Sequence, residues 1–166
     1  MPLSMYQLTV PVYVRSLSAL STLLDKAAAH AAGKKFDPAV LVGARLAPDM
    51  FSLAEQVRAT CNYPIRSCAR LAGLPIPTFD GKDATIADLK ARIAWTIDFV
   101  KSVDQAKIEG TDEKEIVFPS GDKERRMLGK DYILAFAYPH FYFHLTAAYA
   151  ILRHNGVPLV KDDYMG

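Results

Sequence analysis

Two histidines stand four residues apart in the segment Pro139-His140-Phe141-Tyr142-Phe143-His144. On a helix, side chains at this spacing project from the same face, one turn apart. Two imidazoles placed in this way can bind one divalent metal ion. The alternative is a pair of core histidines, each hydrogen-bonded to the backbone or to a tyrosine, because a buried imidazole without a partner costs free energy.

Pro139 stands directly before the first of these histidines. Proline has no backbone N–H, so a helix through this position leaves a carbonyl group free one turn earlier, near Ala135. We therefore expect a loosened helical turn beside the histidine pair. A kink that serves packing alone explains Pro139 equally well.

The segment that carries the histidines, residues 132–152, has no formally charged side chain. Its length would suffice to cross a bilayer. A proline, two histidines, a threonine and four tyrosines within it argue against a membrane span. We expect instead a helix that is covered on all sides, with Tyr138, Tyr142 and Tyr149 covered by a second copy of the chain. This predicts a homodimer, unless residues 113–128 or the C-terminal tail fold back over the same face.

The remaining apolar residues recur mostly at helical spacing. The expected elements are helices over 5–32, 48–72, 85–107 and 130–154, a short helical turn over 38–45, a loop over 74–82, a β-hairpin or extended excursion over 113–128, and an irregular tail over 157–166. This pattern predicts an all-α fold, an antiparallel four-helix bundle with the short hairpin or excursion before the last helix. A chain of 166 residues with 51% hydrophobic and 23% charged residues fits a single domain over residues 1–166.

Charge and cysteine content exclude several classes of function. The net charge is +2 and no basic run occurs, so we expect no nucleic-acid partner. Cys61 and Cys68 lie too far apart along a helix for a disulfide and are expected in the core. Free thiols, and the lack of a basic segment followed by a long apolar stretch at the start, favour a cytoplasmic protein.

Four segments of the chain carry a resemblance to a known family. They are Leu46-Ala47-Pro48-Asp49-Met50-Phe51, Phe118-Pro119-Ser120-Gly121, the histidine segment 139–144, and Arg153-His154-Asn155-Gly156-Val157-Pro158. The chain resembles the DinB/YfiT-like superfamily of metalloenzymes, in a branch described only as a domain of unknown function. This resemblance implies a four-helix bundle in which three histidines hold a divalent metal such as Zn, Ni or Fe. One of those histidines comes from the second helix and two come from the fourth, and some members are thiol-dependent transferases or isomerases.

Two of the three ligands that the resemblance implies are present. His140 and His144 match the pair on the fourth helix, but no histidine occurs between His30 and His140. Asp49 is the carboxylate nearest to the expected place of the third ligand. Two histidines and one carboxylate form a known divalent-metal set, although an acidic residue in the first turn also suits the helix dipole.

The pocket around the metal is expected to include Gln56, seven residues after Asp49 on the same helix face. Tyr13 and Tyr142 are expected to wall it, with core packing as the alternative for both. The resulting hypothesis is a metal-dependent transferase or hydrolase that acts on a small molecule or a thiol. The alternative is a non-catalytic, dimeric binding or structural bundle that has lost the metal, because no other catalytic motif occurs.

Overall fold

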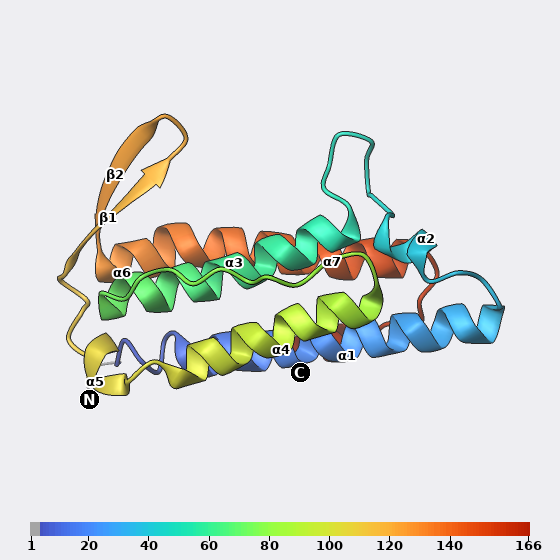
Figure 1. The fold of residues 1–166 in the computed structure, drawn as a ribbon, viewed down its shortest axis with the longest axis horizontal. Coiled ribbons are helices and arrows are strands. Elements are labelled where there is room, and N and C mark those ends of the chain that lie inside the picture. Colours follow the sequence, from blue (N-terminus) through green and yellow to red (C-terminus); the bar gives the residue numbers. More distant parts are fainter. Residues whose placement is uncertain (1–3) are drawn as a thin grey trace.

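Four long helices lie side by side in the computed structural model, which describes residues 4–166 (Figure 1). They are α1 (Val10–Lys34), α3 (Leu53–Ala72), α4 (Ile86–Ser102) and α7 (Tyr138–His154). Helix α3 packs against both α7 and α4, and α4 packs against α1. The four expected helices are therefore present, arranged as one pair, α3 and α7, stacked on another, α1 and α4. One cluster of buried apolar side chains runs between them.

Helix α3 begins at Leu53, five residues later than the expected start at 48. The reason is a capping box: the Ser52 hydroxyl accepts a hydrogen bond from the backbone N–H of Glu55, and the Glu55 carboxylate accepts one from the backbone N–H of Ser52. This reciprocal pair satisfies two N–H groups that the helix start leaves free. Asp49 therefore lies in an exposed turn before the helix, and not within its first turn.

Other element boundaries also differ from expectation. The first helix begins at Val10 and places Pro11 in its first turn, where a missing N–H costs nothing. The expected third helix stops at Ser102, and the short helix α5 (Gln105–Ile108) follows, capped by the Asp104 side chain. The short turn expected over 38–45 is helix α2 (Ala39–Val42).

The excursion before the last helix is an antiparallel β-hairpin. Strands β1 (Glu115–Ser120) and β2 (Lys123–Leu128) pair around a turn in which Gly121 has a φ of 61°. Figure 1 shows the hairpin near the end of the helices at which α6 lies, projecting away from them to one side. Phe118 is nevertheless buried, because its ring packs against Tyr132 and Phe136.

The expectation of an irregular tail is wrong, because residues Lys161–Met165 form helix α8. The Lys26 ammonium lies 2.6 Å from the Asp163 carboxylate and ties this helix to α1. Tyr164 of α8 packs edge-on against Tyr149, with 5.8 Å between ring centroids. The tail thus folds over part of the tyrosine face that led us to expect a homodimer. The dimer stays a prediction, and a mass of 18.3 kDa by light scattering would contradict it.

Both cysteines are free and buried, as expected. Burial raises the pKa of each thiol to about 12. Among residues 4–166, no helix is both long and apolar enough to cross a membrane.

Candidate active site

The two histidines lie on α7 just after a widened helical segment. The short helix α6 (Gly129–Asp131) leads into a π-helix, η1 (Tyr132–Ala137), and α7 continues from it. Pro139 is in the first turn of α7, so the loosened turn expected near Ala135 is confirmed. π-helical segments of this kind often occur at functional sites.

His140 is held by the π-helical segment that precedes it. Its Nδ1 lies 2.8 Å from the backbone carbonyl oxygen of Phe136. A carbonyl oxygen only accepts, so Nδ1 carries the proton and donates it. In the neutral ring Nε2 then keeps its lone pair.

His144 is held by the buried amide of Gln56 on α3. Its Nδ1 donates to Oε1 of Gln56 at 2.8 Å. The Gln56 amide nitrogen donates to the carbonyl oxygen of Phe51 at 3.5 Å, which fixes the orientation of the amide. His144 therefore also keeps a lone pair on Nε2. Burial, and then the neighbouring charge of His140, lower the pKa of His144 below 6.5, so that its ring is neutral at pH 7.

Tyr63 of α3 stacks on both imidazoles. Its ring centroid lies 5.1 Å from that of His140 and 5.9 Å from that of His144, with interplanar angles of 25° and 18°. Burial raises the pKa of the Tyr63 hydroxyl, which keeps the phenol neutral. Sequence reasoning missed this residue, although it follows Gln56 by seven positions and thus two turns on the same helix face.

The structure separates the other expected site residues from the histidines. Tyr13 is fully buried, and its hydroxyl donates to the Ser67 hydroxyl at 3.1 Å. Tyr142 is half-buried and packs against Tyr138. Asp49 is exposed in the turn before α3. Of the expected pocket residues, Gln56 is the one that contacts the pair.

Among the described residues, no third histidine, cysteine, aspartate or glutamate lies with the imidazoles as a metal ligand. Within residues 4–166, no three side chains of histidine, cysteine, aspartate or glutamate gather in a way that could hold a metal ion. What the structure assembles is a pair of imidazoles on α7, each with its Nδ1 proton committed to a neighbour. Two such rings can accept a proton or a hydrogen bond through Nε2, or donate the Nε2 lone pair to a cation.

Comparison with known proteins identifies a family and a similar solved structure. The family described as "Domain of unknown function (DUF1993)" matches residues 5–165. A solved structure, described as a DinB family member protein from Shewanella denitrificans, is 37% identical, with a TM-score of 0.89. The match covers 97% of this chain and 91% of that one. No curated protein matches the chain.

Proposed function

Because the chain belongs to the family of the domain of unknown function DUF1993 and has a DinB-like fold, we propose that the histidine pair is its working centre. We further propose that the pair acts as a base on a small molecule that carries a hydroxyl or thiol group. The observation that supports this is that both Nδ1 atoms are committed as donors, which leaves both Nε2 atoms free to accept. As in the superfamily, the four long helices would form an antiparallel four-helix bundle and one domain.

In this proposal His144 accepts the proton of the bound hydroxyl or thiol at Nε2. The ring is ready for this step, because its lowered pKa keeps it neutral at pH 7. As the ring becomes charged, its Nδ1–H donates more strongly to the Gln56 oxygen, and this stabilises the cation. A positioned base of this kind contributes roughly 10²–10⁴-fold to a transfer or hydrolysis reaction.

A resident divalent metal, Zn, Ni or Fe, fits this donor set incompletely. Histidines that bind metals usually donate their other ring N–H to a carbonyl or carboxylate, as His140 and His144 do. A catalytic zinc, however, normally has three protein ligands, and the described residues supply two. The described residues therefore lack one ligand of a catalytic zinc site.

A second candidate is a binding or structural protein without catalysis. The lack of a third metal ligand among the described residues supports this second candidate. The fold would then keep the imidazole pair only to bind a ligand. In that case the two Nε2 atoms accept hydrogen bonds from a small ligand that is not transformed.

Hydrolysis of p-nitrophenyl acetate by the purified, tag-free protein tests the proposal. We expect His144→Ala to lose most of the rate above background. The control His154→Ala, at the exposed end of the same helix, should keep it. Equal rates for the wild type and His144→Ala would reject catalysis at this centre, and a rate that EDTA abolishes and zinc restores would support the metal instead.

A further inference from the structure

We infer that a second cleft, between α3, α4 and the segment that joins them, binds a small organic carboxylate with an apolar body. The cleft has a volume of about 310 Å³. Five of its nine lining residues are apolar and four are polar or charged, and polar groups within such a pocket fix the orientation of a ligand. Neither histidine nor Gln56 lines this cleft, which is therefore separate from the histidine centre.

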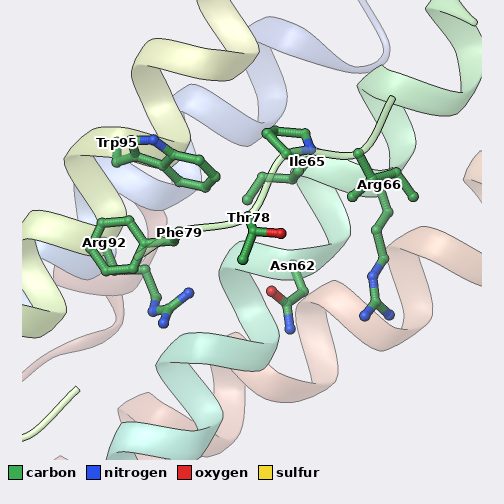
Figure 2. A pocket seen from close by; sticks show the side chains of 9 residues that line it. Asn62, Ile65, Arg66, Thr78, Phe79, Arg92 and Trp95 are labelled. Atoms are coloured by element: carbon green, nitrogen blue, oxygen red, sulfur yellow. The ribbon is translucent and has the colours of Figure 1, made fainter. Parts of the chain in front are cut away.

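The apolar walls come from all three parts of the chain. Ile65 belongs to α3 and Trp95 to α4, while Ile76, Pro77 and Phe79 belong to the connecting segment. The rings of Phe79 and Trp95 lie 5.3 Å apart, and Figure 2 shows them on one side of the cleft, with Asn62 and Arg66 on the other. An aromatic or branched apolar group would pack against these rings.

Arg92 holds the connecting segment in place. It is only 8% exposed, and its Nε and Nη2 donate to the two carboxylate oxygens of Asp83 at 2.6 and 2.9 Å. Its guanidinium also lies over the Phe79 ring, 4.5 Å from the centroid. Burying such an ion pair is costly compared with apolar packing. The ion pair with Asp83 therefore does more than fix the connecting segment: it also positions the Arg92 guanidinium as a hydrogen-bond donor at the cleft.

One donor group of Arg92 remains available to a ligand. Within residues 4–166, the Nη1 atom of Arg92 makes no hydrogen bond to the protein. Every fully buried side-chain nitrogen or oxygen in that part of the chain has a hydrogen-bond partner, so Nη1 is not fully buried. Nη1 is thus in reach of solvent. Because Arg92 lines the cleft, a ligand oxygen can approach this atom.

Arg66 gives the cleft its net charge. Asp83 offsets the charge of Arg92, and no carboxylate in the described part of the chain lies within ion-pair distance of Arg66. Asn62, one turn earlier on α3, adds a neutral amide to the same lining. A single uncompensated guanidinium beside neutral donors suits one carboxylate group, and the aromatic walls suit the apolar remainder of the molecule.

Trp95 is the only tryptophan of the chain, so its fluorescence reports directly on the cleft. We expect benzoate to change this fluorescence in a saturable way, and benzamide, its neutral analogue, to bind much more weakly. Arg66→Gln should weaken benzoate binding by about tenfold or more, the equivalent of one charge-assisted hydrogen bond. The control Arg58→Gln, an exposed position two turns earlier on α3 outside the cleft, should leave binding unchanged.

Calorimetry with the same ligands completes the test. His144→Ala should bind benzoate like the wild type, which separates this site from the histidine centre. No saturable binding of benzoate at millimolar concentrations would overturn the inference. If benzamide binds as tightly as benzoate, or if Arg58→Gln weakens benzoate binding as much as Arg66→Gln, the role of Arg66 is overturned. If inorganic phosphate binds as tightly as benzoate, the ligand needs no apolar body and that part of the inference is overturned.

Discussion

Replacing Gln56 by leucine removes the hydrogen bond that holds the Nδ1 proton of His144. Gln56 is 1% exposed, and its Oε1 accepts the His144 Nδ1 proton at 2.8 Å. A hydrogen bond of this kind contributes about 1 kcal/mol net. The donor left behind adds to this cost, but by less than in a fully buried residue, because His144 is half-buried. We therefore expect a loss of about 1–2 kcal/mol, or roughly 2–4 °C in Tm for each kcal/mol.

The functional effect of Gln56→Leu should exceed this loss of stability. Without the acceptor, the proton of His144 can move to Nε2, and the lone pair that we assign to catalysis is then lost. ¹⁵N NMR of the imidazole separates the two tautomers, and ester hydrolysis measures the consequence. The control Gln56→Glu keeps an acceptor at the same place and should keep Nδ1 protonated. If Gln56→Leu retains the wild-type tautomer and rate, the assigned role of Gln56 is refuted.

Three further predictions concern stability. Burial lowers the pKa of His144 in the folded protein below its ordinary value, so the folded state disfavours the charged ring. Stability is therefore unaffected above the ordinary pKa and falls as the pH drops below it. The urea midpoint should drop more between about pH 7.5 and about pH 5.5 in the wild type than in His144→Asn. Gly129→Ala would drive a Cβ into the backbone oxygen of Thr111 and should cost about 3 kcal/mol in thermal denaturation. The control Gly33→Ala, near the end of α1, places its Cβ in open space and should stabilise by about 0.5–1 kcal/mol. Ser52→Ala removes the cap of α3 and should cost about 1 kcal/mol by the same assay, and an unchanged Tm would contradict the capping role.

Local signals predicted much of the fold. The helix expected from residue 85 agrees with the observed N-cap of α4 at Thr85, whose side chain accepts from the backbone N–H of Asp88, and the observed hairpin lies within the excursion expected over 113–128. Ser52 followed by Glu55 encodes the start of α3 in the sequence, but the helix was expected from residue 48, so this local signal was not used. The tail could not be predicted in this way, because α8 depends on contacts with a helix more than a hundred residues away.

The sequence predicted only those features of the candidate site that a single helix determines. The spacing of His140 and His144 places both on one face of α7, whatever lies opposite. Which residues of α3 meet them depends on how the two helices are rotated against each other, and no local pattern encodes that rotation. This explains why Tyr63 was missed, and why Tyr13 was expected at the site but lies in the core.

Helix α3 contributes residues to both proposed sites, and its geometry shows how one helix can do so. Asn62 and Tyr63 are neighbours in sequence, about 100° apart around the helix axis. Asn62 therefore lines the cleft beside α4, whereas Tyr63 stacks on the histidines of α7. The two sites are joined electrostatically as well, because the charge of Arg66 lowers the pKa of Tyr63 against the larger effect of burial. A carboxylate bound at Arg66 would offset that charge, so the pKa of Tyr63 should rise when the cleft is filled.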